Sequence, residues 1–240
     1  MKILIPPSEG KSKINISNIE FIETKNIFFD EIKKILEILS SVKNEELVKI
    51  YGTSFDKSKI IHDENLNILN NKCSQAIERY TGVVYNNFDF KSLDESSKKF
   101  AEDKILITSG FLGLVKLNDL IPNYKLKMNS LKLSAFWKPI FSNYLKDEDF
   151  ILDLLPTIHK KSYESKKSVE IDFKFIKNNK SISAGHNGKA IKGKFIRFVV
   201  ENKLEKLDEI IEFKQDGFAW DGKHFVTVSY THLRAHETVS

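Results

Sequence analysis

Residues 105–128 read ILITSGFLGLVKLNDLIPNYKLKM, and this stretch is the most informative in the chain. It begins as a continuous apolar run, which is typical of a buried strand. Ser109, Gly110 and Gly113 then interrupt the run. A glycine at the end of a strand permits the close approach of a ligand or of another backbone. The stretch therefore predicts a buried strand that delivers a loop to a sheet edge, where backbone amides could hold an anion.

The flanking segments mix strand and helix patterns without a strict βαβ repeat. Buried strands are expected at 2–5 (KILI) and 150–156 (FILDLLP), an alternating strand at 169–176, and a hairpin about Asp221-Gly222. Helices are expected at 30–42, 44–52, 65–80, 92–103 (with a Ser92 and Glu95 capping box), 134–145 (containing Pro139), 188–202 and 206–213. The mixture predicts an α+β fold, organised as a single compact domain over residues 1–228.

Residues 229–240, SYTHLRAHETVS, do not continue this pattern. We expect them to be a non-native tail of translated adapter sequence, and we leave them out of the functional argument. The string THLRAHE lacks an acidic or cysteine partner at the spacing of a zinc site, so no metal is expected there.

Composition narrows the class of protein. The chain has 240 residues, of which 41% are hydrophobic and 30% charged, which excludes a compositionally disordered protein. No apolar run approaches the roughly 20 residues of a membrane span, and the N-terminal run is too short for a secretory signal. We therefore expect a cytoplasmic protein without membrane contact. Cys73 is the only cysteine and is expected on a helix, so neither a disulfide, a bound metal nor thiol catalysis is predicted.

Positive charge is concentrated in one part of the chain. Residues 116–206 carry 19 Lys and Arg against 10 Asp and Glu, whereas residues 1–115 carry 16 against 17. An excess of this kind indicates an anionic partner. The alternative is that many of these lysines only form solvated faces, for example opposite the apolar residues of the expected helix 188–202.

Five segments resemble, in the same order, the YaaA family of peroxide stress proteins. The opening stretch carries the most distinctive one, and PPSEGKS, ERYTGVVY, HNGKAIKGKFIRFVVEN and DGFAWDG carry the others. The matching residues are Ser8, Lys11, Tyr80, Thr81, Gly82, Val84, Tyr85, Ser109, Gly110, Gly113, Lys116, Asp119, Tyr124, Lys125, Leu126, Met128, Lys189, Lys192 and Gly193. The chain departs from the family pattern at Leu112, Leu117, Lys127 and Lys192, where the family has Tyr, Pro, Glu and Arg. TIHKKSY also replaces an acidic Glu-Tyr element of the family.

The resemblance implies a DNA-binding protein of the cellular response to hydrogen peroxide, which protects DNA without redox chemistry of its own. It also implies a positively charged cleft and a helix-hairpin-helix-like element. The partner is expected to be DNA, double-stranded and bound without sequence specificity, because lysine outnumbers arginine and suits phosphate contacts better than guanine edges. No cofactor is expected, and a monomer is favoured.

Candidate residues follow from the motifs and from the charge. The expected DNA- or anion-binding residues are Lys11, Lys116, Lys125, Lys189, Lys192, Lys194 and Arg197. Those expected to shape the cleft are Ser8, Gly110, Gly113, Asp119, Tyr124 and Gly193. The eight expected to face one common cleft are Ser8, Lys11, Ser109, Gly110, Asp119, Tyr124, Lys189 and Lys192.

A second class of function stays open at this point. An enzyme acting on a nucleotide or nucleic acid would draw its catalytic residues from Ser8, Lys11, Ser109, Asp119 and His186. The Gly10-Lys11-Ser12 sequence is not expected to bind ATP, because the first glycine of a phosphate-binding loop is missing at the required distance. Tyr85 and Tyr124 can equally be core aromatics, and the two glycines of the opening stretch can be simple turn residues.

Overall fold

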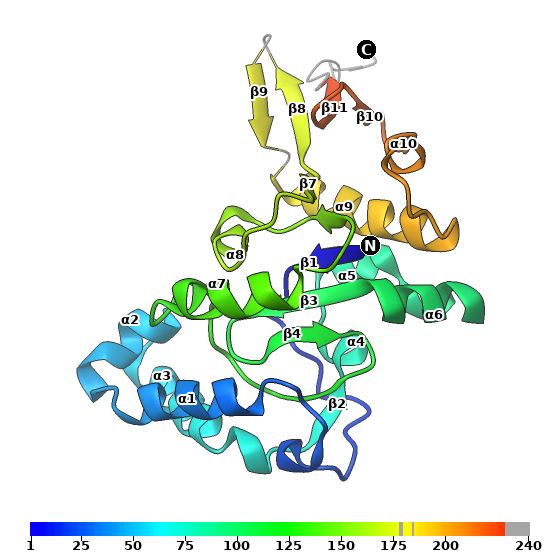
Figure 1. Cartoon of the computed structure of the whole chain (residues 1–240). Coiled ribbons are helices and arrows are strands. Elements are labelled where there is room, and N and C mark those ends of the chain that lie inside the picture. Colours follow the sequence, from blue (N-terminus) through cyan, green and yellow to red (C-terminus); the bar gives the residue numbers. More distant parts are fainter. Residues whose placement is uncertain (178–179, 184, 229–240) are drawn as a thin grey trace, which may run out of the picture.

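A five-stranded sheet forms the centre of the molecule (Figure 1). The computed structural model describes residues 1–177, 180–183 and 185–228, with side chains at 1–176 and 188–227. The strand order is β4-β3-β1-β6-β7, and only the β3–β4 pair is antiparallel. The strands are β1 (Lys2–Ile5), β3 (Ile105–Ser109), β4 (Gly113–Lys116), β6 (Ile151–Asp153) and β7 (Ser168–Glu170).

The three inner strands are buried on both faces, which explains their sequences. Ile3 pairs with Ile105 on one side and with Leu152 on the other, and all three side chains are almost fully buried. Parallel strands covered on both faces read as continuous apolar runs, because neither face meets water. The predicted strands at 2–5, 105–108 and 150–156 are therefore confirmed, with β6 shorter than its apolar run.

Helices cover this sheet and extend to one end of the molecule, where α1, α2 and α3 lie together (Figure 1). The helices are α1 (Phe29–Ser40), α2 (Leu47–Tyr51), α3 (Phe55–Leu66), α4 (Ala76–Arg79), α5 (Val83–Phe88), α6 (Glu95–Lys104), α7 (Leu133–Tyr144), α8 (Thr157–Lys160), α9 (Gly185–Glu201) and α10 (Leu207–Ile210). Short 3-10 turns are η1 (Phe21–Glu23), η2 (Asn44–Glu46), η3 (Ile68–Asn70) and η4 (Phe90–Ser92).

A second sheet lies at the opposite end and is joined to the first through α9 (Figure 1). Its order is β10-β11-β8-β9, and the β10–β11 hairpin confirms the turn predicted at Asp221-Gly222. The strands are β8 (Phe173–Lys177), β9 (Lys180–Ser183), β10 (Ala219–Trp220) and β11 (Phe225–Val228). Phe195 of α9 packs against the rings of Phe173 and Phe225, so α9 is fixed to this sheet by an aromatic cluster. The mixed α and β class is thus confirmed, with several sheets.

Three local predictions are wrong. The expected strand 169–176 is broken at residues 171–172 into β7 and β8, which belong to different sheets. The expected helix 65–80 contains the end of α3, η3, a strand β2 (Cys73–Gln75) and α4. Strand β2 forms because it pairs with β5 (Leu120–Pro122). The cap of α6 is Asp94 rather than Ser92, since the Asp94 carboxylate accepts the Ser97 N–H.

The two glycines of the opening stretch serve packing rather than ligand approach. A β-carbon on Gly110 would lie 2.8 Å from the backbone nitrogen of Met128, and Gly113 has a φ of 81° and lies against the ring of Phe28. Trp137 of α7 donates its indole N–H to the carbonyl of Gly110, which fixes the turn. Because these contacts are internal, Gly110 and Gly113 act as turn and packing residues, and neither lines the cleft described below.

Candidate functional site

The main cleft opens where β1 and β6 end, and it has a volume of about 930 Å³. Pro6 and Pro7 end β1, and Leu155 and Pro156 follow β6, so two loops leave the same edge of the sheet. Ligand sites of α/β sheets lie at this carboxyl edge. The cleft is lined by Pro6, Pro7, Ser8, Glu9, Gly10, Thr81, Gly82, Val83, Val84, Tyr85, Leu155, Pro156, Thr157, Lys160, Asp172, Phe173, Lys174, Gly188, Lys189 and Lys192.

Four lysines and two carboxylates line this cleft. Lys189 is exposed, and Lys192, one turn further along α9, donates a 2.9 Å hydrogen bond to the carbonyl of Leu154. Burial lowers the pKa of Lys192, and the carboxylate of Asp172 opposes that shift. Lys160 forms an ion pair of 2.6 Å with Glu170 outside the lining and lies 4.0 Å from Asp172. The lining thus presents several ammonium groups on one side of the sheet edge.

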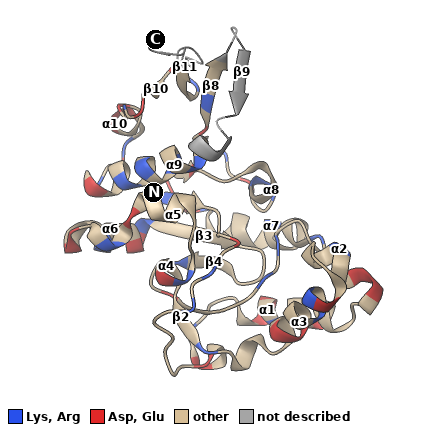
Figure 2. Ribbon diagram, turned by 180° about the vertical axis from the view of Figure 1, so that it is seen from behind, with Lys and Arg blue, Asp and Glu red and all other residues tan. Residues whose placement is uncertain are grey.

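Helix α9 is held rigidly against α5, which fixes the position of its two cleft lysines. Gly193 lies so close to α5 that an added β-carbon would be 2.9 Å from the backbone nitrogen of Phe88. Arg197 donates hydrogen bonds to the carbonyls of Phe88 and Asp89 and to the hydroxyl of Ser92. Figure 2 shows the basic residues spaced along α9. These contacts make α9 a defined platform rather than a mobile arm.

The loops that form the cleft are joined by hydrogen bonds between distant parts of the chain. The hydroxyl of Ser8 accepts the Thr81 N–H at 2.9 Å and donates to the carbonyl of Gly10 at 2.6 Å. Tyr85 of α5 donates to the carbonyl of Pro6 at 2.8 Å. The loop after β1 is therefore locked to the turn that precedes α5.

A second polar cluster lies beside this loop and consists of Lys11, Tyr80, Ser109 and Tyr124. The Tyr124 hydroxyl lies 2.6 Å from both the Tyr80 hydroxyl and the Ser109 hydroxyl. The Lys11 Nζ lies 4.2 Å from the ring centroid of Tyr124 and 5.5 Å from that of Tyr80. Burial raises the pKa of Tyr124 to about 12 and that of Tyr80 well above its usual value. We call this group the tyrosine–lysine cluster.

The residues predicted to share one cleft do not all lie together. Some line the cleft, some belong to the tyrosine–lysine cluster, and others lie outside both sites. Ser8, Lys189 and Lys192 line the cleft, while Lys11, Ser109 and Tyr124 belong to the tyrosine–lysine cluster. Asp119 lies elsewhere, because its carboxylate accepts the Lys116 N–H at 2.7 Å and closes the turn between β4 and β5. The prediction of one common cleft is therefore corrected to two adjoining sites.

Besides Lys11, four of the basic residues predicted to contact phosphate do not line the cleft. Two of them are held in ion pairs within the protein. Lys194 forms an ion pair with Asp216 at 2.6 Å, and Arg197 pairs with Glu201 at 2.6 Å as well as bonding to α5 and η4. Lys116 is exposed at the end of β4, and Lys125 lies near Glu9 and Lys11. His186 lies outside the residues whose side chains are described, as does the tail 229–240.

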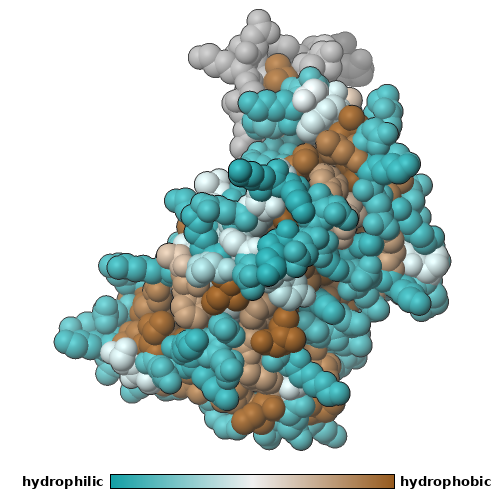
Figure 3. Space-filling view, in the orientation of Figure 1, coloured by the Kyte–Doolittle hydropathy of each residue, from teal (hydrophilic) through white to brown (hydrophobic). Residues whose placement is uncertain are grey.

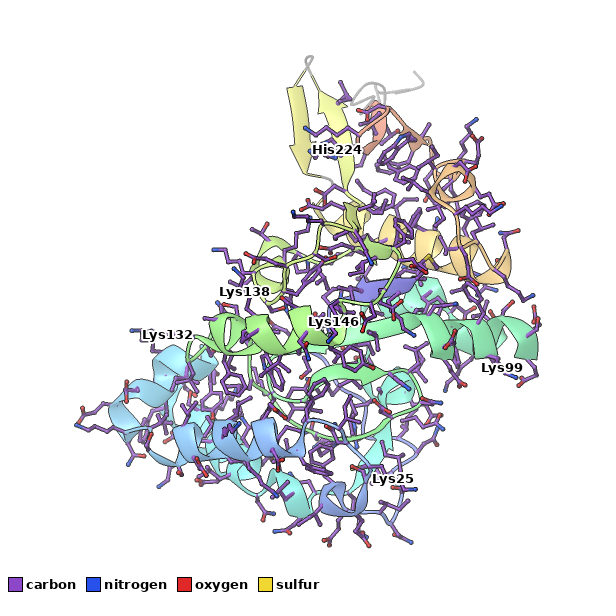
Figure 4. The ribbon with its side chains drawn as sticks, in the orientation of Figure 1. Lys25, Lys99, Lys132, Lys138, Lys146 and His224 are labelled. Atoms are coloured by element: carbon purple, nitrogen blue, oxygen red, sulfur yellow. The ribbon has the colours of Figure 1, made fainter. Side chains whose placement is uncertain are left out.

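Four charged cleft residues, Glu9, Lys160, Asp172 and Lys174, were not predicted. Asp172 marks the point where the chain passes from β7 to β8, and an aspartate in an otherwise alternating strand could have indicated that break. Nothing in the sequence singles out Lys160 or Lys174, because their position depends on how the second sheet packs on α9. Figure 4 shows Lys25, Lys99 and Lys132 on separate parts of the molecule, so these three lysines do not gather at one site.

The thiol of Cys73 is poorly suited to redox chemistry. Cys73 is buried in β2, not on the helix predicted for it, and burial raises its pKa to about 12. A thiol reacts with peroxide as the thiolate, which is scarce at such a pKa. Within the described side chains, no group of three or more His, Cys, Asp and Glu could hold a metal ion. No helix in the part of the chain that the structure describes is long and apolar enough to cross a membrane.

The face in Figure 3 is mostly hydrophilic, and its apolar patches are separated by hydrophilic side chains. The fold and the cleft together define a mixed α/β protein with a lysine-bearing cleft at the carboxyl edge of a mainly parallel sheet. A family model described as peroxide stress protein YaaA matches residues 1–224, and the chain belongs to that family. The resemblance seen in the motifs is thereby confirmed.

Relatives cover nearly the whole chain. An uncharacterised protein of Campylobacter jejuni is 31% identical over 227 residues, which is 88% of this chain and 89% of that protein. A UPF0246 protein of Fusobacterium nucleatum is 29% identical, with 91% of this chain and 92% of that protein covered. A UPF0246 protein of Flavobacterium psychrophilum is 26% identical, with 92% and 95% covered.

Proposed function

We propose that the cleft binds the phosphate backbone of double-stranded DNA without sequence specificity, as part of the cytoplasmic response to hydrogen peroxide. One observation carries the proposal. Lys160, Lys174, Lys189 and Lys192 come from three separate elements, α8, β8 and α9, and all line the same cleft. A row of ammonium groups neutralises phosphates without reading bases. The family description as a peroxide stress protein gives the cellular setting.

A pair of short helices supports the same proposal. The helix-hairpin-helix-like element implied by the family resemblance corresponds best to α4 and α5, which are joined by residues 80–82. Gly82 has a φ of 115°, a backbone conformation that favours glycine, and Thr81 and Gly82 line the cleft. In this proposal the turn between α4 and α5 contacts the backbone of the duplex while the lysines neutralise phosphates beside it.

The test is a salt titration of duplex binding. If each of the four cleft lysines neutralises about one phosphate, the log-log slope should be near −3 to −4. Replacing Lys189 and Lys192 together by alanine should flatten the slope by about 2, because two released counterions are lost. The matched control is Lys194→Ala on the same helix, since Lys194 already pairs with Asp216, and its slope should stay within about 0.3 of wild type. Equal effects of the two variants would refute the cleft as the interface.

A nucleotide-processing enzyme is the second candidate, favoured by the size and place of the cleft. A volume of about 930 Å³ at the carboxyl edge of β1 and β6 is within the range of small-molecule sites. A mononucleotide panel run beside the duplex separates the two functions. Salt-insensitive, saturable binding or turnover of one nucleotide, with no duplex binding, would replace the DNA proposal by this one.

A further inference from the structure

Lys11 lies against two aromatic rings and forms no ion pair within the described residues. Its Nζ lies between the rings of Tyr124 and Tyr80, and its hydrogen bond goes to the carbonyl of Ser8 at 3.3 Å. Among the described residues, no carboxylate lies within 4 Å of this nitrogen. Burial of an ammonium group without an ion-pair partner favours its neutral form.

Two nearby cations also favour the neutral form of Lys11. Burial first, and then the guanidinium of Arg79 and the ammonium of Lys125, lower the pKa of Lys11 to about 8, while the carboxylate of Glu9 opposes the shift. Arg79 is itself almost fully buried and is held by the carbonyls of Ser12 and Ile121, so its charge stays in place. With a pKa of about 8, roughly a quarter of the Lys11 side chains are neutral amines at pH 7.5, against about 0.1% for an ordinary lysine.

The neighbouring hydroxyls supply a proton. The Ser109 hydroxyl accepts the N–H groups of Phe111 and Leu112, so both of its lone pairs are used and it must donate its own proton to Tyr124. Tyr124 and Tyr80 share one hydrogen bond between their hydroxyls. One hydroxyl proton of the tyrosine pair therefore has no acceptor among the hydroxyls of the cluster.

Lys11 is also next to the cleft. Ser8, Glu9 and Gly10 line it and lead directly into Lys11, which is half-buried, and Tyr80 packs at 5.6 Å on the cleft residue Tyr85. A nucleophilic amine, a proton donor and a phosphate-binding cleft thus lie side by side. Desolvation and a second nearby cation are the means by which a lysine is made nucleophilic toward carbonyl carbon.

We propose that Lys11 forms an imine with an aldehyde carried beside a phosphate, the chemistry found at a base-free deoxyribose in DNA, and this substrate rests on the proposed DNA binding. The amine attacks the carbonyl carbon and forms a C–N bond, and one nitrogen proton passes to the carbonyl oxygen to give a hydroxyl group. The tyrosine pair donates a proton to the departing oxygen, and the C–O bond breaks to release water. The nitrogen returns its proton to the tyrosine pair, leaving an imine. One aldehyde and one amine give one imine and one water, so neither an oxidant nor a reductant is needed.

The test is chemical trapping with the full chain. Wild type is incubated with a duplex containing one base-free site, with the intact duplex, and with pyridoxal 5′-phosphate as a small aldehyde that carries a phosphate. Borohydride then reduces any imine to a stable amine, and peptide mass mapping locates it. The expected adduct is at Lys11, with a rate that rises through about pH 8. Lys11→Arg keeps the positive charge but should lose at least about 100-fold in trapping rate, and Tyr80→Phe should lose about 10-fold or more.

Comparison of the three incubations identifies the source of the aldehyde. Trapping at Lys11 by the base-free duplex supports a DNA substrate, and trapping only by pyridoxal 5′-phosphate supports a small phosphorylated aldehyde. Adducts spread over other lysines, or equal trapping by Lys11→Arg, would overturn the inference. Binding of the intact duplex is measured in the same samples. Duplex binding without an adduct rejects the imine alone, whereas a Lys11 adduct without duplex binding rejects the proposed function alone.

Discussion

Replacing Gly193 by alanine should destabilise the protein, because α9 crosses α5 at this residue without room for a side chain. The added β-carbon would lie 2.6 Å from the Cβ of Asn87 and 2.9 Å from the backbone nitrogen of Phe88, and it would also meet the carbonyl oxygen of Val84. Two of these three atoms belong to the backbone of α5. A change of rotamer therefore cannot relieve the contact, and the two helices must separate.

Two opposing effects set the size of the change. Alanine is favoured over glycine in a helix by about 1 kcal/mol. Overpacking a close contact costs about 1–3 kcal/mol, and three contacts this short belong at the upper end of that range. The expected net loss in the free energy of unfolding is about 1–2 kcal/mol. For a chain of this length, that lowers the Tm by about 2–8 °C.

Urea and thermal denaturation of wild type and Gly193→Ala measure this loss. The control is Gly10→Ala, where the added β-carbon would meet only the Thr81 hydroxyl oxygen at 2.9 Å. That atom can rotate away, so we expect a change within about 0.5 kcal/mol. A Gly193→Ala protein as stable as wild type, or more stable, would show that α5 and α9 do not pack this closely. Duplex binding should weaken with the stability, since Lys189 and Lys192 lie on the same helix.

Two further predictions concern buried groups. Burial lowers the pKa of His159 to about 4, below the value of about 6.5 in an unfolded chain. The unfolded state binds the extra proton, so stability should fall as the pH drops from about 6.5 to 4, by at most about 3 kcal/mol. Urea titrations across this pH range should show a smaller fall in the free energy of unfolding for His159→Gln than for wild type. If the fall is the same in both proteins, other groups cause it. Cys73, which is buried with a pKa of about 12, should resist iodoacetamide at pH 8 in the folded protein and react once unfolded. Rapid labelling of the native protein, followed by mass spectrometry, would contradict that burial.

The elements that the sequence predicts well are those whose pattern has one structural cause. Strands β1, β3 and β6 are apolar throughout because both faces are covered, and α1 places Ile32, Ile35 and Leu39 on its buried face. Strand β2 could not be predicted in this way. Its Cys73–Gln75 sequence has no strand pattern, and it forms because Leu120–Pro122 of the opening stretch lies beside it. Likewise, an alternating run such as 169–176 does not indicate to which sheet each half belongs.

The candidate site illustrates a second limit, which concerns charge. The excess of basic residues in 116–206 predicts an anionic partner but not which lysines meet it, because intramolecular pairing decides that. Lys194 and Arg197 lie on the same helix as Lys189 and Lys192, yet both are held in ion pairs and neither lines the cleft. Lys160 lines the cleft although it pairs with Glu170, a contact that a phosphate must compete with or share. The contribution of each cleft lysine to phosphate binding therefore depends on the intramolecular contact that it must break. Lys189 forms no ion pair within the described residues and should be the strongest single contact, ahead of Lys192, which would give up its bond to Leu154.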